Sequence, residues 1–257
     1  MRAEPMTRLI GTSLKMYFGH QRTLRYCTEI AEIAGRHPAV RESAAELFVL
    51  PSFPALAPAV QRCQETPVAI GAQDLFWEDE GAYTGEVSGA ELREMGCRYA
   101  EVGHAERRRI FGEDEQVIAG KTAAALRNGL TPVLCLGEED RGEPARAIRT
   151  CRAQLDSALH AARSDGVLGP IVVAYEPQWA IGAAEPASPE FIGEVCAALR
   201  AGVAADPALS GSRVIYGGSA KPGLLTALGD SVDGLFLGRF AHDPRAFEQI
   251  LDEVSAP

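Results

Sequence analysis

Short apolar runs alternate with longer amphipathic stretches along the chain. Each run is nearly continuously apolar and rich in β-branched residues, as in parallel strands that are buried on both faces. About eight such runs occur, at residues 9–11, 47–50, 68–71, 99–102, 133–136, 171–174, 214–216 and 235–237. The intervals between them are long enough for crossover helices. Good helix formers fill these intervals at 28–34, 121–127, 145–162, 190–203 and 244–254, and the pairs Ser188-Pro189 and Asp243-Pro244 are helix start signals.

Strand–helix repetition predicts an α/β fold, either an open doubly wound sheet or a closed (β/α)₈ barrel. About eight units in about 250 residues is the usual size of the barrel. Polar residues follow almost every run, whereas an open sheet would use chiefly its switch point. We therefore predict a single TIM barrel with eight parallel strands and outer helices. No linker divides residues 1–257, so we expect one domain with a structured core at about 6–254.

The composition narrows the class of protein. The chain has 25 Lys and Arg against 35 Asp and Glu, a net charge of −10, which argues against a nucleic-acid-binding protein. A hydrophobic content of 46% is typical of a globular core. No apolar run is long enough for a membrane span, and the first residues lack a signal-peptide pattern. Six scattered cysteines without a CxxC pair predict reduced thiols in a cytoplasmic enzyme. The five histidines have no metal-binding spacing, so we expect no metal.

Two glycine-rich loops follow the last two predicted strands. Gly217-Gly218-Ser219 comes after the seventh strand, and Gly238 comes after the eighth. Glycine lets the backbone approach an anion closely, so that its N–H groups bind phosphate. Most such triplets are ordinary turns, but these two loops stand where barrels usually bind phosphate. The sequence therefore favours a phosphorylated ligand.

Three further residues at strand ends are candidates for chemistry. Glu176 directly follows an apolar strand, where partial desolvation would make its carboxylate a better base, unless it is simply solvated. His104 precedes a predicted helix, whose N-terminal dipole would keep the ring neutral, although a core histidine is the commoner role. Lys15 follows the first strand, where it would attract an anion, or it is an ordinary surface charge. Together with a phosphate site, these residues suit proton abstraction next to a carbonyl, through an enediol(ate).

These residues lie in segments that resemble the triosephosphate isomerase family along nearly the whole chain. The matching segments occur in the family's order and include Ser13-Leu14-Lys15-Met16, Gly71-Ala72-Gln73, Gly81-Ala82-Tyr83-Thr84-Gly85-Glu86, Val102-Gly103-His104-Ala105-Glu106-Arg107-Arg108, Leu134-Cys135-Leu136-Gly137-Glu138, Tyr175-Glu176-Pro177-Gln178-Trp179-Ala180-Ile181-Gly182, Tyr216-Gly217-Gly218-Ser219 and Asp233-Gly234-Leu235-Phe236-Leu237-Gly238. The resemblance implies an isomerase of the aldose–ketose type that needs no cofactor or metal.

The resemblance also implies a role for each residue. Glu176 would be the base, His104 the electrophile and proton shuttle, and Lys15 the stabiliser of negative charge, with Glu106 beside them. The phosphate would be held by Gly182, Ser219, Gly238 and Arg239. The segment 177–187, which includes Pro177, Trp179 and Pro186, would form a lid that Tyr216 and Ser219 latch. The loop from Gln73 to Glu86 would enter a second subunit, with Thr84 near the partner's site, in a homodimer.

Several positions depart from the family pattern. Ser13-Leu14 stands where the family has Asn-Trp, and the smaller Ser13 would lengthen the pocket at the reacting end. Pro186 alters the lid, and Arg239 replaces the second glycine of the last loop. This pattern resembles the branch that interconverts L-erythrulose 1-phosphate and D-erythrulose 4-phosphate in tetritol breakdown, which is the leading prediction. The alternative is an authentic triosephosphate isomerase of glycolysis and gluconeogenesis.

Two other classes stay open. One is a phosphosugar-binding protein without activity, against which the joint presence of Lys15, His104, Glu106 and Glu176 argues. The other is an aldolase-like barrel in which Lys15 forms a Schiff base, which borohydride trapping would reveal.

Overall fold

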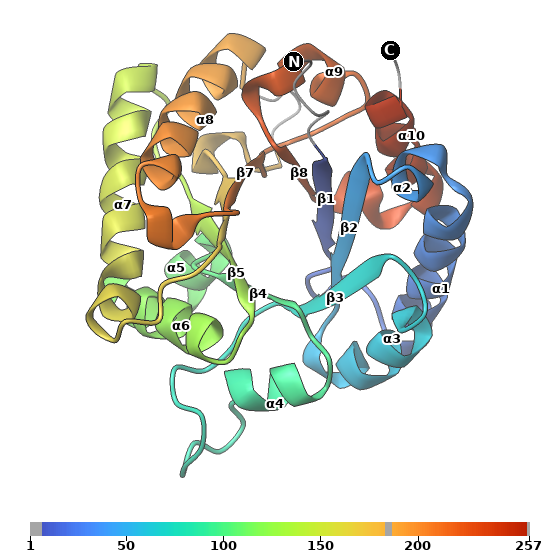
Figure 1. The fold of residues 1–257 in the computed structure, drawn as a ribbon, viewed down its shortest axis with the longest axis horizontal. Coiled ribbons are helices and arrows are strands. Elements are labelled where there is room, and N and C mark those ends of the chain that lie inside the picture. The colour runs from blue at the N-terminus through green and yellow to red at the C-terminus, as the bar shows by residue number, and fades with distance from the viewer. Residues whose placement is uncertain (1–6, 183–186, 256–257) are drawn as a thin grey trace.

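The eight predicted strands close into one parallel barrel. The computed structural model describes residues 7–182 and 187–255. Within them each strand pairs with the next, and the last pairs with the first (Figure 1). The strands are β1 (Arg8–Ser13), β2 (Ala45–Leu50), β3 (Val68–Ala72), β4 (Tyr99–Val102), β5 (Thr131–Leu136), β6 (Val172–Tyr175), β7 (Arg213–Tyr216) and β8 (Gly234–Leu237). The prediction of a (β/α)₈ barrel is confirmed, and the open-sheet alternative is wrong.

The helices form a ring outside the strands (Figure 1). They are α1 (His20–Arg36), α2 (Pro38–Arg41), α3 (Leu56–Cys63), α4 (Gly89–Glu94), α5 (Ala105–Phe111), α6 (Glu115–Arg127), α7 (Pro144–Ser164), α8 (Pro189–Ala204), α9 (Leu224–Leu228) and α10 (Pro244–Ser255). All five predicted helical stretches lie in α1, α6, α7, α8 and α10. Both start signals are caps: Ser188 accepts the N–H of Phe191 at 3.3 Å, and Asp243 accepts that of Arg245 at 3.0 Å.

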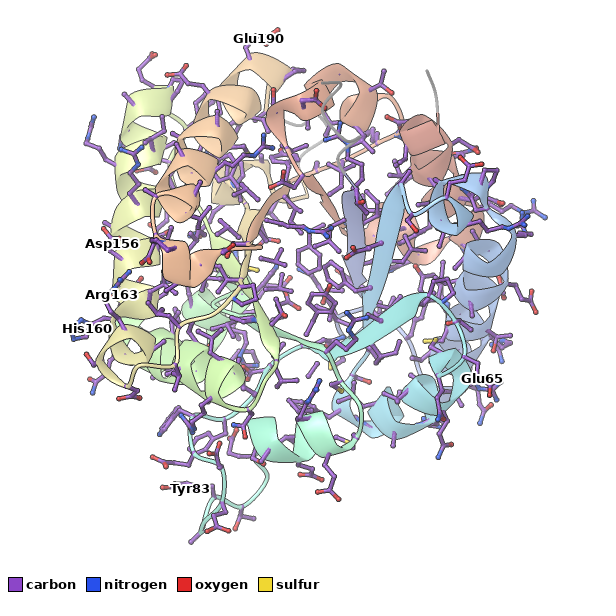
Figure 2. All side chains as sticks on the ribbon, in the orientation of Figure 1. Glu65, Tyr83, Asp156, His160, Arg163 and Glu190 are labelled. Atoms are coloured by element: carbon purple, nitrogen blue, oxygen red, sulfur yellow. The ribbon has the colours of Figure 1, made fainter. Side chains whose placement is uncertain are left out.

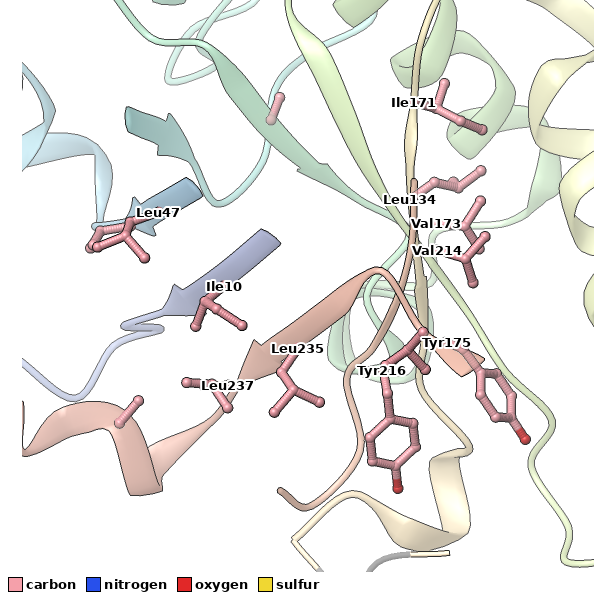
Figure 3. Packing of buried hydrophobic residues seen from close by; sticks show 14 of the residues in the cluster. Ile10, Leu47, Leu134, Ile171, Val173, Tyr175, Val214, Tyr216, Leu235 and Leu237 are labelled. Carbon is pink, nitrogen blue, oxygen red and sulfur yellow. The ribbon is translucent and has the colours of Figure 1, made fainter. Parts of the chain in front are cut away.

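A large apolar layer lies between the strands and the helices. Alternate strand residues face outward into it, among them Ile10, Leu47 and Val214 (Figure 3). Tyr175 and Tyr216 lie in the same layer on neighbouring strands, with ring centroids 6.2 Å apart. Burying one such side chain stabilises the fold by roughly 1.5–3 kcal/mol. This layer holds each strand at a fixed depth and therefore fixes where its last residue stands.

A second, smaller core fills the barrel interior. Phe48 packs there against Tyr99 and Phe236, at 4.8 and 5.7 Å between ring centroids. The ring of Phe48 needs a glycine opposite it, since a Cβ at Gly11 would lie only 2.0 Å from that ring. These aromatic rings fill the interior, so a ligand site belongs at the open end beyond the strands' last residues.

Two further features bear on function. The segment after β3 projects from the barrel as an exposed loop, and Tyr83 lies near its tip (Figures 1 and 2). All six cysteines are buried and free, as predicted. Across the described ranges, no helix combines the length and the apolar character needed to cross a membrane.

Candidate active site

A cavity of about 480 Å³ opens at the carboxyl ends of the strands. The residues that line it follow β1, β4, β6, β7 and β8 in sequence, so the barrel brings distant segments to one place. All eleven residues predicted to act in catalysis or substrate binding are among them, namely Ser13, Lys15, Glu106, His104, Glu176, Gly182, Gly217, Gly218, Ser219, Gly238 and Arg239. Sequence reasoning missed Tyr17, Arg109 and Lys221, which also line the cavity.

Lys15 is held in a strained backbone conformation at the end of β1. Its φ of 48° lies in the left-handed region, which is costly for a residue with a side chain. The Gln73 amide donates to the carbonyls of Lys15 and Leu50, at 3.0 and 2.9 Å, and so holds this turn. Lys15 Nζ then reaches Glu106 Oε1 at 2.9 Å and His104 Nε2 at 3.1 Å. Burial opposes its charge, but Glu106 and Glu176 outweigh burial and raise the pKa of Lys15.

His104 is the N-cap of α5, as the sequence predicted. Its Nδ1 accepts the backbone N–H of Glu106 at 3.1 Å, so in the neutral ring the proton belongs on Nε2. Burial, and then the charge of Lys15, lowers the pKa of His104 to about 4. The ring is therefore neutral at physiological pH. The sequence predicted the helix dipole as a cause, and the structure adds burial and Lys15 as further causes.

Glu176 comes directly after β6 and is almost completely buried. Burial, and then repulsion from Glu101, raises the pKa of Glu176 to about 8. Its Oε2 lies 3.6 Å from His104 Nε2 and forms no hydrogen bond with the described part of the chain. A Cβ at Gly217 would lie 2.6 Å from the Cγ of Glu176, so this glycine makes room for the carboxylate. The arrangement leaves one carboxylate oxygen without a hydrogen-bond partner among the described residues, in a side chain that lines the cavity.

Glycines form the opposite, exposed rim of the cavity. Gly182 and Gly238 are exposed there, beside the predicted loop 217–219. Arg239 is exposed at this rim, and its guanidinium lies 5.7 Å from the ring centroid of Tyr17. Flexible backbone N–H groups beside a cation suit a phosphate group.

The segment after Glu176 is anchored at both ends. Pro177 precedes a short 3₁₀ helix, η2 (Gln178–Ala180), in which the Trp179 indole N–H donates to Glu138 at 2.8 Å. Ser219 Oγ donates to the Ala180 carbonyl at 3.0 Å. The buried Tyr216 hydroxyl lies near the main chain of Ala187, beyond the undescribed stretch, but forms no hydrogen bond with the described part of the chain. Pro186 lies outside the described residues.

Glu101 is an acidic residue of the barrel interior that sequence reasoning missed. It lies within β4, and its Oε2 accepts the hydroxyl of Ser13 at 2.9 Å. Burial raises the pKa of Glu101 to about 7. A signal was available, because Glu101 is the one charged residue in the apolar run 99–102, two positions from the inward-facing Tyr99.

Comparison with known proteins agrees with this geometry. An L-erythrulose-1-phosphate isomerase of Pectobacterium atrosepticum is 61% identical over 245 residues, which are 95% of each chain. A second, from Rhizobium etli, is 38% identical over 96% of this chain and 92% of the relative. A triosephosphate isomerase of Moorella thermoacetica is 39% identical over 84% of this chain and 88% of the relative. The family model for triosephosphate isomerase matches residues 8–254, and the chain belongs to the triosephosphate isomerase family.

Proposed function

We propose that this protein is a sugar-phosphate isomerase that interconverts L-erythrulose 1-phosphate and D-erythrulose 4-phosphate. The observation that carries the proposal is the buried, unpartnered Glu176 oxygen 3.6 Å from a neutral His104, with Lys15 beside them. The similarity to an L-erythrulose-1-phosphate isomerase at 61% identity supports the four-carbon substrate.

The reaction is a proton shift between adjacent carbons. Glu176 removes the proton from C3, next to the C2 carbonyl, and the electron pair moves onto the carbonyl oxygen. The Nε2–H of His104 and the Lys15 ammonium stabilise that oxygen, which gives an enediol(ate). His104 then relays a proton between the two oxygens, and Glu176 returns its proton to C2. The carbonyl has moved to C3, and no atom is gained or lost.

The two alternatives from other classes receive less support. A Schiff base requires a neutral lysine amine, but Lys15 has a raised pKa and an ion pair with Glu106. A binding protein without activity would not need a desolvated base beside a neutral imidazole. Triosephosphate isomerase activity is the second candidate, favoured by the 39% identity to the Moorella enzyme. L-Erythrulose 1-phosphate differs from dihydroxyacetone phosphate only by a hydroxymethyl group at C3, so one site can process both substrates.

Turnover of both substrates tests the proposal. We expect a larger kcat/KM for L-erythrulose 1-phosphate than for D-glyceraldehyde 3-phosphate. We expect Glu176→Gln to lower kcat for both by roughly 10²- to 10⁴-fold, because it removes the general base. Circular dichroism of the variant controls for its fold. Preferential turnover of the triose would favour the second candidate, and full activity of Glu176→Gln would overturn the mechanism.

We also propose that the protein works as a homodimer in the cytoplasm. The exposed residues 77–86 of the loop after β3 and the exposed side chains of Met16 and Phe111 support an interface. Six free, buried thiols are in keeping with a reducing compartment.

A further inference from the structure

Ser13 and Glu101 form a polar pair at the buried floor of the cavity. Each is only 3% exposed, whereas Gly182 and Gly238, which line the same cavity, are exposed. Ser13 lines the cavity, and Glu101 lies behind it in β4. A sugar phosphate whose phosphate binds at the exposed glycines extends its other end into the buried part of the cavity, where Ser13 lies.

The hydrogen bond between the pair decides what Ser13 can offer to a ligand. A serine hydroxyl has one hydrogen to donate and two lone pairs that accept. The Ser13 hydroxyl donates its hydrogen to Glu101 Oε2 at 2.9 Å. It is left as an acceptor toward the cavity, and the adjacent carboxylate polarises it further. Such a group selects ligands that carry a hydroxyl donor at this end.

A buried carboxylate here needs an explanation beyond stability. Burying an ionised group is costly unless it is paired, and Lys15 attracts Glu101 whereas Glu106, Asp74 and Glu176 repel it. Lys15 Nζ already forms an ion pair with Glu106 at 2.9 Å. Neighbouring charges therefore offset little of the cost of burying the Glu101 carboxylate, so its position is not explained by stability. The carboxylate is well placed to orient the Ser13 hydroxyl.

We propose that Ser13 accepts a hydrogen bond from the C4 hydroxyl of the four-carbon substrate, and that Glu101 is the positioning residue that orients Ser13. The pair thereby sets the preference for a substrate with a hydroxymethyl group at the reacting carbon. A three-carbon substrate has only hydrogen at that place and cannot make this bond. The inference rests on the proposed function and names the groups that determine its substrate.

The test compares L-erythrulose 1-phosphate with its 4-deoxy analogue, in which a methyl group replaces the hydroxymethyl group. Dihydroxyacetone phosphate serves as the third substrate. For the wild type we expect kcat/KM to be roughly 10- to 100-fold higher for the hydroxyl-bearing substrate than for the deoxy analogue, the usual range for a hydrogen bond next to a charge. Ser13→Ala should reduce that ratio to about twofold or less, because the acceptor is gone.

Two Glu101 variants separate orientation from structure. Glu101→Gln keeps an oxygen that can accept from Ser13, so most of the hydroxyl preference should remain. Glu101→Val removes that oxygen, so the preference should fall as in Ser13→Ala. Thr12→Val is the matched control, because its buried hydroxyl donates to Leu237 on the neighbouring strand instead. Its hydroxyl preference should equal that of the wild type.

The possible outcomes show separately whether the role of Ser13 and Glu101 fails or the proposed isomerase function fails. A wild type that turns over no four-carbon ketose phosphate overturns the proposed function and the inference with it. A wild type with the expected preference, together with a Ser13→Ala variant that keeps it, overturns the inference alone. An equal loss of rate on all three substrates in Glu101→Val, with the preference unchanged, would likewise assign Glu101 a purely structural role.

Discussion

Three buried side chains in the site titrate far from their ordinary values, in opposite directions. Burial raises the pKa of Glu101 to about 7 and that of Glu176 to about 8, and it lowers the pKa of His104 to about 4. Each shift favours the neutral form of its group in a place that water barely reaches, and for Glu176 this is the form that results when it accepts the substrate's proton. The folded and unfolded chains therefore bind different numbers of protons across the physiological range.

These shifts predict how stability depends on pH. Between about pH 4.5 and 8 the folded carboxyls of Glu101 and Glu176 hold protons that the unfolded chain releases. The free energy of unfolding therefore falls as pH rises through that range. Below about pH 6.5 the unfolded chain protonates His104 and the folded chain does not, which offsets part of this slope but not all of it, since two carboxyls outweigh one imidazole. Each pKa unit is worth about 1.4 kcal/mol, so we expect the free energy of unfolding to be a few kcal/mol higher near pH 5 than near pH 8.

Urea unfolding at fixed protein concentration, from pH 4 to pH 8.5, checks this expectation. Glu101→Gln cannot titrate, so its decline on the alkaline side should be shallower than that of the wild type. An unchanged alkaline slope in this variant would show that Glu101 has an ordinary pKa in the folded protein.

Single residues also show how far a sequence can be interpreted. Lys15, His104 and Glu176 each come within four residues after an apolar run, and the closed barrel brings the ends of these strands together. Glu101 lies inside a run, where its effect depends on a partner in another strand. Pairing of Ser13 with Glu101 follows from the closure of the barrel, which no local pattern contains.

At the scale of elements, the strands were predictable and the short helices were not. A parallel strand buried on both faces leaves an apolar run, and all eight runs lie in strands except for Ile171, which precedes β6 by one residue. Helices α4, α5 and α9 have at most seven residues, too few for a repeating apolar face. Of these, α5 was expected only because its N-terminus would follow His104.

The segment after Glu176 allows a prediction about phosphate release during the reaction. Ser219 donates to Ala180 before its undescribed part, and the buried Tyr216 hydroxyl lies near Ala187 after it, with no hydrogen bond to the described residues. If the segment closes over the intermediate, a hydrogen bond from each hydroxyl would favour the closed state, in which water is excluded and phosphate is retained. We expect Tyr216→Phe and Ser219→Ala each to increase phosphate release per turnover by roughly 2- to 10-fold, the usual value of one hydrogen bond.

A coupled assay for inorganic phosphate during isomerisation measures this leakage. Tyr26→Phe is the control, since its buried hydroxyl bonds to Ala241, away from this segment. Equal leakage in Tyr216→Phe and Tyr26→Phe would remove the latch role from Tyr216.

For the whole molecule, the distribution of charge matters more than its sum. The chain carries a net charge of −10, yet Lys15, Arg109, Lys221 and Arg239 all line the cavity. Cations gathered in a concave site focus the field there and attract a phosphorylated anion despite the acidic surface. A phosphorylated anion is thus repelled by the net negative charge of the chain but attracted by the cations at the cavity.

The exposed apolar side chains and the projecting loop predict an assembly of two chains. Met16 is 95% exposed and directly follows the strained Lys15, and Phe111 is 65% exposed. A partner that covers Met16 would stabilise the turn that holds Lys15, so assembly and activity should be lost together.

We expect the wild type to sediment as a dimer of roughly 55 kDa, twice the chain mass of 27.4 kDa. Thr84→Asp places an uncompensated charge in the loop and should weaken the dimer by roughly 30-fold or more, with a parallel loss of kcat. Ala145→Asp adds the same charge at an exposed position on α7 and should leave both unchanged. A fully active monomer at low protein concentration would show that each barrel completes its own site, and that the loop serves another purpose.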